Sequence, residues 1–189
     1  MPAPPPAPKP KPRVRLDTSY GPIVVELEPE IAPITVANFL RYVNEGFYAG
    51  TVFHRVIPGF MIQGGGMAPD LIEKPTHGAI TNEAPATFKA GLKNLVGTLA
   101  MARTPDPHSA SSQFFINTAD NASLDHTART AEGMGYCVFG RVVEGMDVVL
   151  KIEKVTTVWR RGMQNVPEYP VFIKKAEALE AAAASESRP

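Results

Sequence analysis

The chain has 189 residues, and its 19 Lys and Arg residues balance its 19 Asp and Glu residues, so the formal net charge is zero with histidine neutral. This length favours a single domain, and 44% hydrophobic residues are typical of a globular protein with its own core. The balanced charge argues against a nucleic-acid binder, which needs a broad positive field. The lone Cys137 cannot form an internal disulfide, and no uncharged stretch reaches the ~20 residues of a membrane-spanning helix.

Both ends of the chain have the composition of tails. Residues 1–12, MPAPPPAPKPKP, are rich in proline and offer almost no apolar residue to a core, so we predict a disordered tail that acts as an extended spacer. Docking of this tail into a partner's aromatic groove is the alternative. No intact secretory signal is present, which leaves a cytoplasmic or a periplasmic location open. The small and polar residues 180–189 predict a second disordered tail.

The domain is expected to begin with a hairpin, because β-forming residues in Val14–Ser19 and Ile23–Glu28 flank the turn residues Tyr20-Gly21-Pro22. After Pro33, apolar residues recur at helical spacing until Gly46 offers a stop, which predicts a first helix.

The middle of the chain consists of short apolar runs separated by glycine and proline, a pattern that favours a barrel or a sandwich. The predicted strands are Thr51–Val56, Phe60–Gln63, Leu95–Ala102, Phe114–Asn117 and Cys137–Val143. A second amphipathic helix is predicted over Met146–Val155, and a closing strand over Val171–Lys174.

Several chemistries have little support. Gly64-Gly65-Gly66 is not followed by the Lys-Ser/Thr pair of a phosphate-binding loop. The four histidines lie at least 18 residues apart, and no Cys or His pair has zinc-knuckle spacing. Cys137 stands in an apolar run and is expected to be a core thiol. We therefore expect neither a metal nor another cofactor.

The segment Phe53 to Gly65, FHRVIPGFMIQGG, is unusual because Arg55 stands among apolar β-formers while no Asp or Glu lies between Gly46 and Pro69. Arginine in such surroundings normally needs a carboxylate partner. Two interpretations stay open: the charge faces a cleft, or the side chain is exposed and paired with a distant acid.

This segment closely resembles the signature of the cyclophilins, the cyclosporin-binding peptidyl-prolyl cis-trans isomerases. Gly97–Ala102 resembles the family's GxLxMA strand, and Ser112–Asn117 its SQFFI segment. The resemblance covers about residues 13–179, and the runs Ser123–His126 and Gly135–Phe139 look like the bacterial branch. The fold implied is mainly β, a closed eight-stranded antiparallel β-barrel capped by two α-helices.

The resemblance also implies a site. Arg55 would be the catalytic arginine and Gln63 the glutamine that orients the substrate. The other implied residues would bind the substrate. The proline pocket would consist of Phe60, Met61, Phe115 and Leu124, and the residues around it would be Ala102, Arg103, Gln113 and Tyr136.

Three positions depart from the eukaryotic pattern. Arg103 stands where asparagine is common, Ser123 where tryptophan is common, and Tyr136 where histidine is common. Because serine offers cyclosporin almost no contact area, weak cyclosporin binding is expected.

The function implied is acceleration of rotation about X-Pro bonds during protein folding, on unfolded or flexible proline-containing polypeptides. We expect a monomer that binds neither nucleic acid nor membrane. One alternative is a chaperone module of the same fold that holds proline-containing chains with little turnover. The other is a hydrolase that uses His54, for which the sequence has no nucleophile motif. Isomerisation of a short X-Pro peptide would distinguish these functions.

Overall fold

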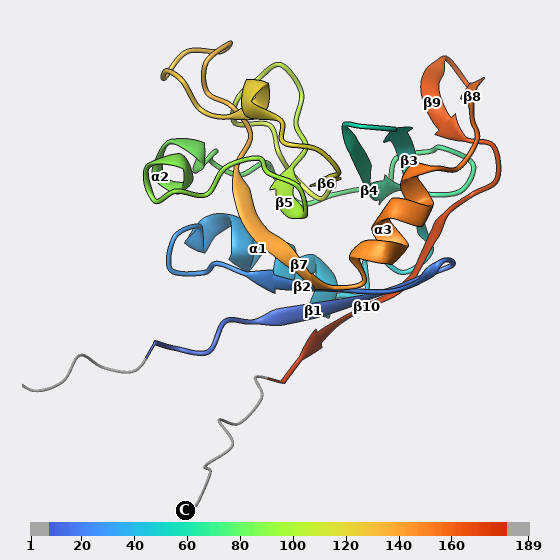
Figure 1. Ribbon diagram of the computed structural model, residues 1–189, viewed down its shortest axis with the longest axis horizontal. Coiled ribbons are helices and arrows are strands. Elements are labelled where there is room, and N and C mark those ends of the chain that lie inside the picture. The colour runs from blue at the N-terminus through green and yellow to red at the C-terminus, as the bar shows by residue number, and fades with distance from the viewer. Residues whose placement is uncertain (1–7, 181–189) are drawn as a thin grey trace, which may run out of the picture.

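The computed structural model describes residues 8–180, in which eight strands close into one barrel. The predictions for residues 1–7 and 181–189, most of both tails, lie outside the described residues. The strands follow the order β1-β10-β3-β4-β6-β5-β7-β2, and every neighbouring pair is antiparallel (Figure 1). Their bounds are β1 Arg13–Thr18, β2 Gly21–Leu27, β3 Thr51–Ile57, β4 Met61–Met67, β5 Thr98–Met101, β6 Phe114–Asn117, β7 Val138–Glu144 and β10 Phe172–Leu179. The predicted closed eight-stranded antiparallel barrel is confirmed.

The two predicted helices are present and pack into the barrel core. Helix α1 spans Pro33–Asn44, begins with proline in its first turn, and buries Val36 and Phe39 among other residues. Helix α3 spans Met146–Glu153 and buries Val149 and Ile152. These side chains belong to the same apolar cluster as the inner face of the barrel.

The sequence did not predict a short helix, a 3-10 turn or a second hairpin. Helix α2, Ala84–Lys89, and the turn η1, Ala122–Leu124, are too short to show a helical period. Strands β8, Thr157–Arg160, and β9, Met163–Pro167, form a separate two-stranded sheet, and β9 packs beside β3 (Figure 1).

Successive side chains of β6 point alternately into the barrel core and toward its outer surface. Phe114 is fully buried and meets three other rings edge-on, those of Phe39, Tyr48 and Phe53. Because successive side chains of a strand point to opposite faces, Phe115 points the other way. It joins a second, smaller apolar cluster, made by Met61, Ala100, Ala102 and Val138. Packing inside the barrel therefore fixes the position of an apolar surface outside it.

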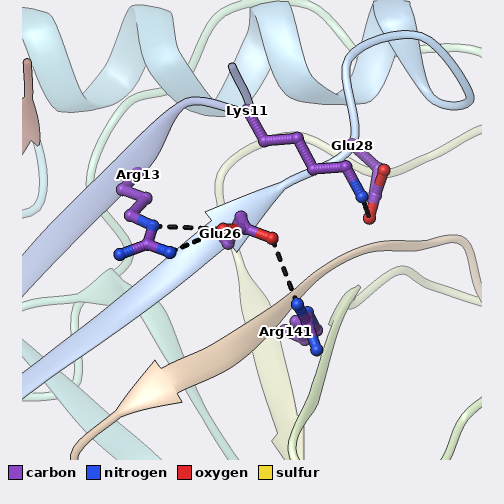
Figure 2. Close-up of polar contacts among 5 residues, drawn as sticks. All are labelled: Lys11, Arg13, Glu26, Glu28 and Arg141. Carbon is purple, nitrogen blue, oxygen red and sulfur yellow. Dashed lines mark hydrogen bonds and ion pairs between the residues drawn. The ribbon is translucent and has the colours of Figure 1, made fainter. Parts of the chain in front are cut away.

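The charged residues at the start of β1 pair with those of β2. Glu26 lies between two arginines, accepting hydrogen bonds from Arg13 at 3.0 Å and from Arg141 of β7 at 3.3 Å (Figure 2). Burial disfavours ionisation of Glu26, but the two arginines outweigh this effect and lower its pKa. Glu26 thus joins β1, β2 and β7 at one place on the barrel.

The same register continues before β1. The Pro12 carbonyl accepts a hydrogen bond from the Leu27 N–H at 2.8 Å, and the Lys11 and Glu28 side chains are 2.6 Å apart (Figure 2). Contacts with the barrel therefore start ahead of residue 13, the first residue of β1 and of the predicted domain.

Candidate active site

One pocket of about 380 Å³ opens beside β4, β5 and β6. Its lining residues are Arg55, Phe60, Met61, Gln63, Ala102, Arg103, Phe115, Leu124 and Tyr136. All nine are among the ten site residues expected from the sequence. The tenth, Gln113, is hydrogen-bonded to Gln63. Residues between 55 and 136 in the sequence thus come together in one place, although their individual roles stay predictions.

The floor of the pocket is apolar. Met61 and Phe115 are only 1% and 4% exposed, because they belong to the outer apolar cluster of β4, β5 and β6. Phe60 and Leu124 pack against this cluster from the chain before β4 and from η1. The result is a cup that suits a ring without a hydrogen-bond donor.

Arg55 stands at the edge of this cup. It lies opposite Gln63 in the β3–β4 register, and its Nη1 donates to Gln63 Oε1 at 3.3 Å. Gln63 Nε2 in turn donates to Gln113 Oε1 at 3.0 Å. Among the described residues no carboxylate lies within ion-pair distance of Arg55. Of the two interpretations left open by the sequence, the structure supports a charge that faces a cleft.

The absence of a side chain at Gly66 leaves room for the Gln113 side chain. A Cβ added at Gly66 would lie 2.8 Å from Nε2 and 2.9 Å from Cδ of Gln113, closer than atoms of this kind pack. Absence of a side chain at residue 66 is therefore what lets Gln113 lie against β4 and reach Gln63. Sequence reasoning considered Gly66 only as part of a possible phosphate-binding loop and missed this role.

Arg103 and Tyr136, two of the three departures from the eukaryotic pattern, contact each other. The Arg103 guanidinium lies 4.5 Å from the centre of the Tyr136 ring. It also donates to the Gly135 carbonyl through Nε at 3.2 Å and Nη2 at 3.1 Å, and to the Thr104 carbonyl through Nη1 at 2.9 Å. The two departures thus form one unit on the wall of the pocket.

Three asparagines support the cup from behind, which sequence reasoning also missed. Asn121 Nδ2 donates to the Phe60 carbonyl and to Asn117 Oδ1, both at 2.8 Å. Asn117 donates to Asn94 Oδ1 at 3.1 Å, and Asn94 donates to Asp125 next to η1 at 3.0 Å. This chain of hydrogen bonds links the segments that carry Phe60 and Leu124. Asn94 and Asn121 stand in loops, where asparagine is typical of turns, and Asn117 ends β6, so the sequence gave no specific signal of this chain.

A family model described as cyclophilin type peptidyl-prolyl cis-trans isomerase matches residues 13–178. The chain belongs to the cyclophilin family. It is 57% identical over 166 residues to a peptidyl-prolyl cis-trans isomerase of Streptomyces antibioticus, covering 88% of this chain and 98% of that protein. It is 52% identical over 168 residues to peptidyl-prolyl cis-trans isomerase B of Escherichia coli K12, covering 88% and 99%.

Solved structures agree with the family. A crystal structure of a cyclophilin type isomerase of Cryptosporidium parvum superposes with a TM-score of 0.75 at 27% identity, covering 89% of this chain and 98% of that chain. The high-identity relatives are bacterial, as the sequence resemblance indicated. This cyclophilin is thus a peptidyl-prolyl cis-trans isomerase, and the predicted enzyme class is confirmed.

His54 of this cyclophilin does not line the pocket. Its side chain is buried, and burial together with the neighbouring Arg55 charge lowers its pKa to about 4. The imidazole is therefore neutral at physiological pH, and no serine of the described part of the chain lines the pocket. The geometry does not support the hydrolase alternative.

Cys137 is 3% exposed, and burial raises its pKa to about 11. Such a thiol is protonated and unreactive. The prediction of a core cysteine is therefore confirmed. Within residues 8–180, none of the helices has the length and apolar character needed to cross a membrane.

Proposed function

We propose that this cyclophilin acts on X-Pro bonds of unfolded or flexible polypeptides, with Arg55 as the catalytic donor and Gln63 orienting the substrate. The observation that carries the proposal is a guanidinium that has no carboxylate partner among residues 8–180 and stands at the edge of an apolar cup. A related structure supports the substrate class, since the Cryptosporidium parvum cyclophilin was also crystallised in the presence of the dipeptide Ala-Pro.

The reaction needs a hydrogen-bond donor and breaks no covalent bond. Rotation about a peptide bond faces a barrier of ~18–20 kcal/mol because resonance between nitrogen and carbonyl is lost. In the twisted transition state the proline nitrogen regains a lone pair, so an N–H aimed at this nitrogen binds the transition state better than either planar isomer. Arginine suits this task because it stays charged and its planar fork fixes several donors at once.

The remaining residues hold the two sides of the bond differently. The proline ring lies in the cup of Phe60, Met61, Phe115 and Leu124, whose packing keeps the ring still. The residues before the proline bind along Ala102, Arg103 and Gln113, and the carbonyl on this side rotates. Gln63 connects the two halves, since it is hydrogen-bonded to both Arg55 and Gln113.

The Arg55→Ala variant tests this assignment. Deleting one preorganised donor lowers kcat/KM by about 10²–10³-fold, while the fold is retained because Arg55 is exposed and makes one side-chain hydrogen bond at 3.3 Å. Isomerisation of a short Ala-Pro peptide is the assay, and circular dichroism checks the fold. Arg41→Ala, an exposed arginine on α1 outside the pocket, is the matched control and keeps wild-type activity. A folded Arg55→Ala protein with normal kcat/KM would refute the assignment.

The pH profile distinguishes this mechanism from proton transfer. Arg55 donates a hydrogen bond without losing its proton, and His54, with a pKa of about 4, does not titrate near neutrality. The rate is therefore expected to be flat from about pH 6 to 9. A bell-shaped profile would favour a general base. Binding of the peptide without acceleration of isomerisation would instead favour the chaperone alternative.

A further inference from the structure

Arg103 is fixed against the pocket wall by neutral groups. Three of its N–H groups donate to the Gly135 and Thr104 carbonyls, and its guanidinium stacks on Tyr136. An arginine has five N–H donors, so two stay available. The Tyr136 ring also meets Phe115 at 5.7 Å, which ties the guanidinium to the wall of the proline cup. The position of this charge is therefore set before any substrate arrives.

Within residues 8–180, no carboxylate balances the Arg103 charge. None of the ion pairs among the described residues includes Arg103, and the lining of the pocket contains no Asp or Glu. Of the acids on neighbouring segments, Asp125 accepts two hydrogen bonds from Asn94 and Asp106 accepts one from the His108 N–H. Glu132, on the loop before Gly135, forms no ion pair with Arg103. Carbonyl oxygens and an aromatic face orient a guanidinium but leave its net charge in place. With Arg55, the pocket holds two positive charges and no negative one.

We propose that Arg103 is a specificity-determining residue that favours substrates with an acidic side chain immediately before the proline. The inference rests on the proposed function, in which the residues before the proline lie along Ala102 and Arg103. A carboxylate there meets the two free N–H donors in a fork that is already held in place. A lysine at the same substrate position meets a like charge. The pair Arg103 and Tyr136 therefore gives this cyclophilin a charge preference that a neutral side chain at residue 103 would not give.

The test compares peptides that differ only in the residue before the proline, which is Glu, Gln or Lys. Surface ion pairs change affinity by a small factor, so we expect kcat/KM to fall about threefold from Glu to Gln and about threefold again from Gln to Lys. The preference is expected to disappear at about 1 M salt, where charges are screened beyond roughly 3 Å. Moving the Glu to the position after the proline is expected to give a smaller effect that does not depend on Arg103.

Variants assign the preference to the residue. In Arg103→Gln the Glu-to-Lys ratio is expected to fall close to one, and in Arg103→Lys, which keeps the charge, much of the ratio is expected to remain. Arg41→Gln removes one positive charge outside the pocket and is expected to keep the full ratio. A merely structural role for Arg103 would lower activity equally for all three peptides. The Glu-to-Lys ratio of kcat/KM cancels such a general loss and therefore reports only the charge preference.

The outcomes separate this inference from the proposed function. No acceleration of a neutral Ala-Pro peptide would refute the proposed function, and the charge preference would still be measurable as the relative affinity of the three peptides in calorimetry. A Glu-to-Lys ratio near one in the wild type, or an unchanged ratio in Arg103→Gln, would overturn the inference while leaving the isomerase activity intact. An Arg103-dependent preference found only after the proline would also overturn it.

Discussion

Replacing Gly66 with alanine tests whether the position of Gln113 matters for catalysis. The new methyl group would lie 2.8 Å from Nε2 and 2.9 Å from Cδ of Gln113, whereas ordinary contact begins near 3.4 Å. Cγ of Gln113 would lie closer still, so the whole Gln113 side chain must be displaced, which breaks its 3.0 Å hydrogen bond to Gln63. Gln63 then loses the hydrogen bond that holds its side chain in place, and Oε1 of this side chain is the atom that accepts the hydrogen bond from Arg55.

The expected size of the effect follows from these contacts. Losing one neutral side-chain hydrogen bond costs about 1 kcal/mol of stability. The effect on catalysis is larger than this suggests, because a misplacement of about 1 Å at a catalytic group can cost up to ~10²-fold in rate. We expect kcat/KM for an Ala-Pro peptide to fall about tenfold, and urea denaturation to show only a small loss of stability.

Two variants make the result interpretable. Gly78→Ala is the control, because a Cβ there meets nothing within 4 Å, and it is expected to keep full activity. In the presence of Gln113→Ala, the Gly66→Ala change is expected to have little additional effect, since its clash is with that side chain. Wild-type kcat/KM in a folded Gly66→Ala protein would refute the reasoning, as would equal losses with and without Gln113.

Two further predictions concern stability and inhibitor binding. The lowered pKa of Glu26 contributes stability that is present above its unfolded pKa of about 4.5 and is lost as the pH falls toward its folded pKa. Glu26→Gln is therefore expected to be less stable than the wild type at pH 7. In urea titrations it is also expected to lose less stability on acidification. Parallel pH dependence in both proteins would contradict this. Ser123 is exposed in η1 beside Leu124, so weak cyclosporin inhibition of the wild type and tighter inhibition of Ser123→Trp are expected in the isomerase assay. No gain from Ser123→Trp would exclude residue 123 from the rim of the pocket.

Much of the barrel could be predicted from local patterns. The first hairpin, both long helices and β6 follow from turn residues and apolar periodicity, and the predicted Phe114–Asn117 has the bounds of β6. The order of the strands could not be read in this way, because pairs such as β10 with β3 join segments more than 100 residues apart. The resemblance to cyclophilins implied a closed antiparallel barrel, and the order of its strands comes from the structure.

The second hairpin shows where local signals fail. Its turn has positive φ at both Arg161, 49°, and Gly162, 78°, a conformation for which Asn-Gly is the usual signal. Arginine gives no such signal, and β8 contains the exposed Trp159, so the segment lacks the alternation of a half-buried strand.

The site was predicted by matching motifs, which give residue identities but not contacts. Motif matching identified Arg103 and Tyr136 as separate departures from the eukaryotic pattern. The stacking between their side chains depends on the backbone path of residues 125–136, which no motif encodes. The same holds for Asn121, which reads in the sequence as a turn residue and in the structure supports Phe60. Contacts between distant segments are what sequence reasoning of this kind leaves out.

Closure of the barrel has a consequence for the proposed action on unfolded chains. Such chains expose strands with free N–H and C=O groups, which add readily to the open edge of a sheet and seed aggregation. Because each of the eight strands has a partner on both sides, the described barrel leaves a client little free edge, and the shortest pairing is that of β10 with β3, at Phe172–Val52 and Ile173–Thr51. The separate β8–β9 sheet does have edges, but its strands are four and five residues long and their register is broken between Val158 and Arg160. In the proposed function, a client chain is therefore held by its proline and released without being templated into a sheet.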